Sequence, residues 1–291
     1  MERKGYIGGS DIAPICGLSP WKTPLQVYLD KVGESEPTPD NPAMAYGRMM
    51  EPVIRQWYEA ETGYTVETPE IITHPKHSFL AAHLDGWVPQ AKRTIEIKTA
   101  RSAEDWGDPG TDAIPTYYMT QVQYYLALTA HPVCDVPVSF FGRLPEIYTV
   151  EADAEVQELL IEKARLFWEQ VQRREPPEPT NFADVKALFG GKSVPSEVMA
   201  PAEIEARVQM MRDLQARAKA IEAELEGHKA AVLGFLGQNE VLTDPAGKAL
   251  LTWKMAKGRK TFDAKRFAAE YPGLYEQFIR EGAGSRRLLI K

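Results

Sequence analysis

The chain has 291 residues, 44% of them hydrophobic, and a formal net charge of −7 at pH 7. These proportions are those of a folded globular protein, and they exclude a chain that is disordered throughout. The acidic balance argues against indiscriminate binding to nucleic acid, because an acidic surface repels phosphate on average.

Neither a membrane span nor a secretion signal can be recognised. No stretch approaches the roughly 18 uninterrupted apolar residues that a span requires, and residues 1–5 lead into no hydrophobic signal core. We therefore expect an intracellular protein with no membrane partner. Cys16 and Cys134 cannot build a disulfide framework and lie in no CxxC pair, so we expect both to be buried thiols.

Helical and strand-like patterns alternate through the first half of the chain. Residues 23–32 begin with a Thr cap and a first-turn Pro, which indicates a helix start. Residues 44–61 carry apolar residues at helical spacing and predict a second helix. The apolar stripe of that helix is expected to consist of Met49, Val53, Trp57 and Tyr58.

Short apolar runs separated by turns then predict strands, and further helices follow them. In chain order, the expected elements are strands at residues 70–73, 79–88 and 94–99, a turn-rich loop at 101–115, a helix at 116–129, a hairpin of 136–141 and 146–150, and a long amphipathic helix at 153–173.

Prolines between residues 176 and 201 mark a boundary, since proline interrupts both helix and sheet. We therefore expect two domains, residues 1–190 and residues 191–291. Residues 201–235 have apolar residues spaced mostly three and four apart, which predicts one long helix or a helical hairpin. The elements expected after it are a short strand at residues 249–253 and small helices at 262–267 and 274–279.

The segment Thr94-Ile95-Glu96-Ile97-Lys98-Thr99 combines apolar and charged residues in alternation. Successive side chains of a strand point to opposite faces, so Ile95 and Ile97 are expected in the core. Glu96 and Lys98 then share the other face. Taken alone, the pattern fits equally well an amphipathic strand whose polar face is solvated.

Asp85 adds a second carboxylate. It ends an apolar strand in His83-Leu84-Asp85-Gly86, and ten residues separate it from Glu96, enough for the chain to return as a hairpin. The hairpin would place the two carboxylates side by side, where their oxygens can hold Mg²⁺. The alternative is an ordinary turn Asp before Gly.

Two helical motifs complete the set. Glu51 lies in Tyr46-Gly47-Arg48-Met49-Met50-Glu51-Pro52, and the alternative for it is a solvated helix carboxylate. Residues 117–126 concentrate tyrosines, which more often pack in a core. Gln121 and Tyr125, however, share one helix face at i and i+4.

In order and context, the motifs resemble the lambda exonuclease family of phage recombination nucleases. They are G-R-x-x-E with Glu51, H-L-D-G with Asp85, Glu96-Ile97-Lys98, and Y-M-T-Q-V-Q-Y with Gln121. The likeness covers residues 1–175. It implies a PD-(D/E)XK, restriction-endonuclease-like α/β core with a mixed central sheet flanked by helices. A helical C-terminal appendage follows in this chain.

The resemblance also implies a role for each motif. The metal ligands it implies are Asp85, Glu96, the backbone carbonyl of Ile97, and Glu51 directly or through water. Lys98 would orient or activate the attacking water, and Gln121 would hold that water or the scissile phosphate. The expected cofactor is Mg²⁺, with Mn²⁺ as a substitute, since divalent ions stabilise the attacking and leaving oxygens of a phosphodiester displacement.

The N-terminal segment R-K-G-Y-I-G-G-S-D is similar to the family segment whose Arg and Ser bind a terminal 5′-phosphate. Arg3 and Ser10 are therefore expected to form that site. The alternative is a disordered basic terminus followed by a Ser helix cap. Met44 falls where the family places an apolar wedge that parts the strands.

Two features depart from the family pattern. His83 stands where the lambda protein has a small hydroxyl residue, so its imidazole is expected to replace the family's hydrogen bond. Residues after about 190 have no counterpart in the lambda protein. Residues 245–291 hold 11 Lys and Arg residues against 4 Asp and Glu residues. We expect Lys257, Arg259 and Lys260 to contact DNA, although docking of an acidic partner is an alternative.

We therefore expect a Mg²⁺-dependent exonuclease that degrades linear double-stranded DNA 5′ to 3′ in the bacterial cytoplasm, encoded by a phage or prophage. Its 3′ single-stranded tails would pass to a phage single-strand annealing protein, and a homo-oligomeric ring is expected. No iron–sulfur cluster is expected, because two cysteines cannot supply four thiolates. The alternatives are a PD-(D/E)XK endonuclease and a DNA-binding scaffold with a vestigial core.

Overall fold

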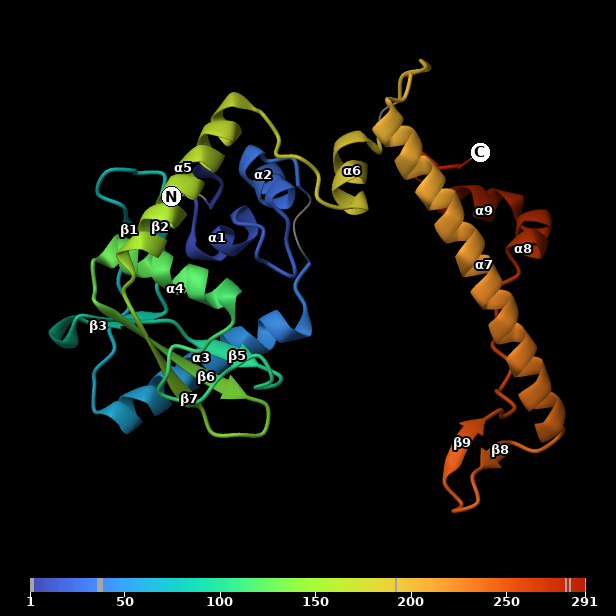
Figure 1. The fold of residues 1–291 in the computed structure, drawn as a ribbon, viewed down its shortest axis with the longest axis horizontal. Coiled ribbons are helices and arrows are strands. Elements are labelled where there is room, and N and C mark those ends of the chain that lie inside the picture. The colour runs from blue at the N-terminus through green and yellow to red at the C-terminus, as the bar shows by residue number, and fades with distance from the viewer. Residues whose placement is uncertain (1–2, 36–38, 192, 281, 283, 291) are drawn as a thin grey trace. The chain divides into compact units, whose positions relative to one another are not determined.

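A computed structural model of the chain describes residues 3–35, 39–191, 193–280, 282 and 284–290. The chain divides into two compact units, Met1–Ala187 and Leu188–Lys291 (Figure 1). The domain boundary after residue 190 stays a prediction, because a domain is defined by its ability to fold alone.

The helices of the first unit begin where the sequence provides caps. The Thr23 hydroxyl accepts a hydrogen bond from the Gln26 backbone, and the Asp153 carboxylate accepts from Glu155 and Val156. The helices are α1 (Gly9–Ile15), α2 (Pro24–Val32), α3 (Pro42–Thr62), α4 (Thr116–Thr129), α5 (Ala154–Arg173) and α6 (Phe182–Phe189), with short 3-10 turns at Arg3–Gly5 and Pro89–Ala91. The four helices predicted in this unit are confirmed as α2 to α5, whereas α1 and α6 are additional.

A mixed five-stranded sheet has β6 (Val133–Phe140) at its centre (Figure 1). β7 (Glu146–Glu151) pairs antiparallel with one edge of β6 and confirms the predicted hairpin. β4 (Arg93–Ile95) and β5 (Lys98–Ala100) pair parallel with the other edge, one after the other. β3 (Gly86–Val88) pairs antiparallel with β4. A separate small pair consists of β1 (Ile72–Thr73) and β2 (Ala81–Ala82).

The strands expected at residues 79–88 and 94–99 are both interrupted, so their predicted bounds are wrong. The second strand breaks at Glu96 and Ile97: the Glu96 N–H still bonds to β6, whereas the Ile97 N–H bonds to a side chain. The Glu96 N–H donates to the Asp135 carbonyl (3.1 Å), and the Ile97 N–H donates to the Asp85 carboxylate (2.8 Å). A side chain thus takes a backbone donor from the strand ladder.

α3 and α4 each pack against the sheet, and two apolar clusters form the core between them (Figure 1). Ile95 and Ile97 are buried against Ile54 and Tyr58 of α3, which confirms their predicted place in the core. On the α4 side, the cluster consists of Ile114, Val122, Leu126, Cys134, Val136, Val138, Phe140, Tyr148 and Val150.

The predicted apolar stripe of α3 is wrong for two of its four members. Met49 is 73% exposed and Val53 is 54% exposed, whereas Ile54 and Tyr58 are fully buried. The Tyr58 hydroxyl donates a hydrogen bond to the buried Asp135 carboxylate (2.6 Å), and this contact fixes the rotation of the helix.

The cysteine prediction holds for one residue of the two. Cys134 is buried in the α4-side core, but Cys16 is only partly buried. The reason is local, because Cys16 stands at the C-terminal cap of α1, where the helix leaves the core.

The described residues of the second unit form one long helix, a hairpin and two short helices. These are α7 (Ala202–Leu236), β8 (Val241–Thr243), β9 (Ala249–Thr252), α8 (Ala264–Glu270) and α9 (Pro272–Phe278). Residues 202–236 therefore form a single helix and not a helical hairpin. Within the described part of the chain, no helix has the length and apolar character needed to cross a bilayer.

Candidate active site

Asp85 and Glu96 lie side by side where β3 and β4 meet. The β3–β4 register pairs Gly86 with Ile95, so the preceding Asp85 stands next to Glu96, as the hairpin prediction required. Glu96 is only 3% exposed, so the alternative of a solvated polar face is wrong for this residue. The Asp85 carboxylate is more than a turn residue, because it accepts the Ile97 N–H and holds the break in the strand.

Lys98 and Gln121 close around the Glu96 carboxylate. The Lys98 ammonium donates hydrogen bonds to Glu96 Oε1 (2.5 Å) and to Gln121 Oε1 (3.1 Å). The Gln121 amide donates to the same Glu96 oxygen (2.6 Å) and to the Tyr125 hydroxyl (2.9 Å). Lys98 Nζ also lies 4.7 Å from the centre of the Tyr118 ring. α4 thus supplies both the amide and an aromatic wall, and the expected pairing of Gln121 with Tyr125 is present.

The site concentrates charge in a buried place. Burial, followed by the neighbouring Asp85 charge, raises the pKa of Glu96 to about 8, against the lowering effect of Lys98. Burial lowers the pKa of Lys98, but Glu96 and Asp85 outweigh it and hold that pKa above its ordinary value. Burial and Asp85 also raise the pKa of Glu51. Burial is thus the main reason why both carboxyl groups hold their protons more tightly than usual, and the Asp85 charge adds to it.

One carboxylate oxygen of the site is buried and stands out by its hydrogen bonding. Among the described residues, buried Glu96 Oε2 accepts no hydrogen bond, and an unsatisfied buried acceptor costs about 1–3 kcal/mol. Hard divalent cations prefer such carboxylate oxygens. In the described part of the chain, no three Asp, Glu, His or Cys side chains gather as a metal site. An ion held by Asp85 and Glu96 would therefore also take backbone or water oxygens.

Glu51 reaches this site from α3, where it is partly buried. Its carboxylate accepts a hydrogen bond from Arg55 (3.0 Å), and the same guanidinium donates to the Asp85 backbone carbonyl (2.7 Å). Arg55 thus ties α3 to the segment that carries Asp85. Sequence reasoning missed Arg55, although its position four residues after Glu51 on a helix was a usable signal.

The two N-terminal residues expected at a phosphate site are together. The Arg3 guanidinium donates to the Ser10 hydroxyl (3.0 Å). Ser10 is not the helix cap of the alternative interpretation, because Gly8 occupies the cap position of α1. Beneath them, the buried Lys31 ammonium donates to the Arg3 carbonyl (3.0 Å) and to the buried Asp11 carboxylate (2.6 Å). Lys31 and Asp11 are positioning residues that the sequence did not indicate.

α1 also contacts the helix that carries Gln121. A Cβ at Gly9 would lie 2.2 Å from the Tyr125 ring, so only glycine permits this close approach. Tyr125 in turn holds Gln121. Ser10, the next residue after Gly9, therefore belongs to a helix that packs directly on the active-site helix.

Met44 lies in a groove beside Lys98. It is in the first turn of α3, is 45% exposed, and lines a groove of about 970 Å³ together with Trp21, Thr99 and Tyr118. Trp21 is 68% exposed, and its ring meets the Tyr117 ring edge-on at 4.7 Å. The role of Met44 as a wedge that parts the strands stays a prediction.

The remaining predicted residues, His83 and the three cations of the second unit, are exposed. His83 is exposed, and its ring lies 6.2 Å from the Tyr6 ring. Lys257, Arg259 and Lys260 belong to the second unit, in the exposed segment between β9 and α8.

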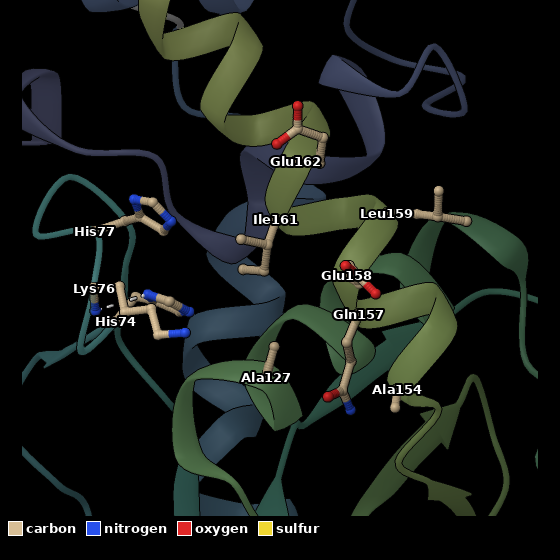
Figure 2. Close-up of a pocket in the computed structure, with 10 residues that line it drawn as sticks. All are labelled: His74, Lys76, His77, Ala127, Ala154, Gln157, Glu158, Leu159, Ile161 and Glu162. Carbon is tan, nitrogen blue, oxygen red and sulfur yellow. Dashed lines mark hydrogen bonds between the residues drawn. The ribbon is translucent and has the colours of Figure 1, made fainter.

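A different hollow of the first unit lies between α5 and the segment that joins β1 to β2 (Figure 2). Figure 2 shows that His74, Lys76 and His77 of that segment line one side of the hollow, and that α5 contributes Glu158 and Glu162 to its lining. The His74 and His77 rings stack at 5.1 Å. The hollow contains none of the predicted site residues, so the candidate active site stays at Asp85, Glu96 and Lys98.

Comparison with known proteins gives three results. Residues 1–132 match a family described as the YqaJ-like viral recombinase domain. The chain is 26% identical to the uncharacterized protein YqaJ of Bacillus subtilis strain 168, over 100% of this chain and 92% of that protein.

The third result is structural. An alkaline exonuclease from Laribacter hongkongensis, LHK-Exo, has a TM-score of 0.50 at 21% identity, covering 60% of this chain and 91% of that one. Its complex with dAMP has a TM-score of 0.50 at 23% identity over the same shares. The predicted fold class is confirmed.

Proposed function

We propose that the protein is a divalent-metal-dependent exonuclease that degrades linear double-stranded DNA from its 5′ ends, a function supported by the match of residues 1–132 to the YqaJ-like viral recombinase domain. The product is a duplex with 3′ single-stranded tails. The observation that carries the proposal is the group of Asp85, buried Glu96 and Lys98, in which Glu96 Oε2 has no partner among the described residues.

The donor set fits a hard cation, and we propose Mg²⁺, with Mn²⁺ as a substitute. The residues that would hold it are Asp85, Glu96, the backbone carbonyl of Ile97, and Glu51 directly or through water. When bound, the cation supplies the positive charge that carboxylates lack toward a phosphodiester. Without such charge, these carboxylates would repel the substrate.

The protein groups then orient the reactants. Lys98 already donates to Glu96 and Gln121, so its ammonium brings fixed positive charge and hydrogen-bond donors to the phosphate. The Gln121 amide, held by Tyr125, is a neutral partner for the attacking water or a phosphate oxygen. Both groups are buried or partly buried, which limits their reorganisation during the reaction.

In the proposed 5′ to 3′ direction, each cleavage restores the kind of end that the enzyme is proposed to bind. Water adds to phosphorus, the bond from phosphorus to the 3′ oxygen of the terminal nucleotide breaks, and a proton passes from the water to that oxygen. A nucleoside 5′-monophosphate leaves, and the shortened strand carries a new 5′-phosphate. Each cycle thus regenerates the dianion that the Arg3–Ser10 pair is proposed to bind. The similar nuclease LHK-Exo forms a complex with dAMP, a compound of this product class.

The first test is digestion of linear duplexes labelled separately at each 5′ and 3′ end. With Mg²⁺, 5′ labels should appear first as mononucleotides, whereas a relaxed circular duplex stays intact. A 5′-phosphorylated end should be degraded at least about tenfold faster than a 5′-hydroxyl end, since a charge-assisted contact contributes roughly 1.5–3 kcal/mol. The Arg3→Ala variant should lose most of this preference.

Lys4→Ala is the matched control, because Lys4 is an exposed cation next to Arg3. It should keep the preference for phosphorylated ends. Cleavage of the circle would establish an endonuclease instead, and absence of any metal-dependent hydrolysis would leave a scaffold with a vestigial core. A wild-type enzyme indifferent to end phosphorylation would refute the assignment of Arg3 and Ser10 alone.

We also propose that the exposed cations of the second unit guide duplex DNA. Lys257, Arg259 and Lys260 stand in a segment without regular structure, and phosphate contacts need no particular sequence. The triple variant Lys257→Gln, Arg259→Gln, Lys260→Gln should bind duplex less tightly. The slope of log affinity against log salt concentration should become shallower by the equivalent of about three phosphate contacts at most. Unchanged affinity and slope in a filter-binding titration would favour an acidic protein partner.

The remaining expectations concern biological setting. We propose a homo-oligomeric ring, encoded by a phage or prophage and active in the bacterial cytoplasm, that hands its 3′ tails to a single-strand annealing protein. Co-purification of the chain with an annealing protein of the same genome would support the partnership. A protein that purifies without such a partner and stays monomeric would refute the assembly.

A further inference from the structure

α7 carries a strict seven-residue repeat. Ile204, Met211, Ala218, Leu225 and Val232 follow one another at intervals of seven, and each is followed three positions later by a second seam residue. The second series is Arg207, Leu214, Ile221, His228 and Phe235. Eight of these ten positions are apolar, over five consecutive heptads. A heptad pattern sustained this long is typical of a coiled coil.

The seam is uncovered over most of its length. Leu214 is 53% exposed, Ile221 is 65% exposed and Leu225 is 51% exposed. The only buried residue of the whole helix is Leu236, at its C-terminal end. A helix that exposes an apolar seam in water is marginal by itself, so the seam requires a partner.

The period of the repeat indicates what kind of partner fits. A straight α-helix has 3.6 residues per turn, so a strict seven-residue stripe drifts by about 20° per heptad around it. Over five heptads the stripe therefore rotates away from a flat or globular surface packed against the helix. Two helices that supercoil around each other follow this rotation and keep the stripe in contact along its whole length. The repeat therefore favours another long helix over the body of a globular domain.

The second unit itself offers no such helix among its described residues. By the rise of an α-helix, α7 with its 35 residues extends about 52 Å. α8 and α9 have seven residues each and extend only about 10 Å. A second copy of α7, by contrast, has the same length and the same heptad phase.

The charges beside the seam agree with a parallel pairing of two copies. With the series that begins at Ile204 taken as heptad position a, each g position lies one residue before an a position. In a parallel pair, a g position faces the e position of the partner helix, which lies five residues later in the sequence. Arg217 then faces Glu222, and Glu224 faces Lys229, each twice by symmetry. None of the other g and e pairs along the helix places two charges of the same sign together. The parallel register is therefore electrostatically favourable.

We propose that α7 pairs with α7 of a second copy of this chain as a parallel, in-register coiled coil. The pairing joins two chains through their second units and does not depend on the proposed nuclease activity. The polar seam residues Arg207 and His228 lower stability but disfavour shifted registers, as polar residues do in coiled-coil seams.

The test is disulfide capture in the full-length protein. In the parallel register Ala218 lies opposite its own copy, so Ala218→Cys should give a covalent dimer under mild oxidation. Ala223→Cys is the matched control, since Ala223 lies on the outward face of the same helix. The wild type, with Cys16 and Cys134, sets the background on a non-reducing gel. Equal dimer from Ala218→Cys and Ala223→Cys would overturn the proposal.

Association in solution gives an independent measurement. The Leu214→Glu, Leu225→Glu variant should associate at least about 100-fold more weakly by sedimentation equilibrium, because each chain then places two charges in the seam. Its hydrolysis of linear duplex should stay measurable. Unchanged sedimentation of this variant would overturn the pairing.

Orientation is tested by charge reversal. Arg217→Glu should weaken association, and adding Glu222→Arg should restore it, since these two positions face each other only in the parallel register. Failure of the second change to rescue the first would overturn the parallel arrangement.

Discussion

Glu96→Gln should reduce hydrolysis of linear duplex DNA by roughly three orders of magnitude while the protein stays folded. The amide keeps the shape of the carboxylate, and its oxygen can still accept from Lys98 and Gln121. The charge is lost, however, and a donor N–H₂ replaces Oε2, the oxygen that has no partner among the described residues. A cation could no longer be held there, so the loss should appear in the rate of cleavage and not in the melting temperature.

The matched control is Glu158→Gln. This substitution makes the same chemical change at an exposed position of α5, beside the hollow of Figure 2. It should leave cleavage within about twofold of wild type, because surface substitutions of this kind change little. Activity of Glu96→Gln within about tenfold of wild type would show that Glu96 is outside the catalytic set.

Asp135→Ala should lower the free energy of unfolding by about 3–5 kcal/mol, the usual cost of removing one partner of a buried ion pair. Asp135 is 3% exposed and accepts hydrogen bonds from Tyr58 (2.6 Å), Arg93 (2.6 Å) and Thr149 (2.9 Å). Its removal would leave three donors without their acceptor. In a domain of this size the melting temperature should fall by roughly 10 °C.

Asp135 lies on the strand next to Glu96, so its role must be separated from catalysis. Below the melting temperature, the Asp135→Asn protein should cleave at close to the wild-type rate per folded molecule, because the Asp135 side chain contacts Tyr58, Arg93 and Thr149. Its contact with Glu96 is through the backbone carbonyl, which the substitution keeps. Asp112→Ala, at an exposed position, serves as the stability control. A stable Asp135 variant without activity would instead place this carboxylate among the catalytic groups.

Local periodicity and capping were sufficient for much of the fold. Thr23 and Asp153 each cap a helix with their own side chain, and the alternation from Ile95 to Lys98 assigns opposite faces. Gln121 and Tyr125 meet because residues four apart share a helix face. These features depend on neighbours a few residues away, so the sequence by itself determined them.

Other features depend on groups far apart in the chain. The rotation of α3, which exposes Met49 and Val53, is held by the bond from Tyr58 to Asp135 across 77 positions of sequence. The strand break at Ile97 depends on the Asp85 carboxylate, which accepts the Ile97 N–H. Arg55 joins Glu51 to Asp85 only once α3 has packed. The tertiary structure decided these features, because buried polar groups take whichever partners packing brings within hydrogen-bond distance.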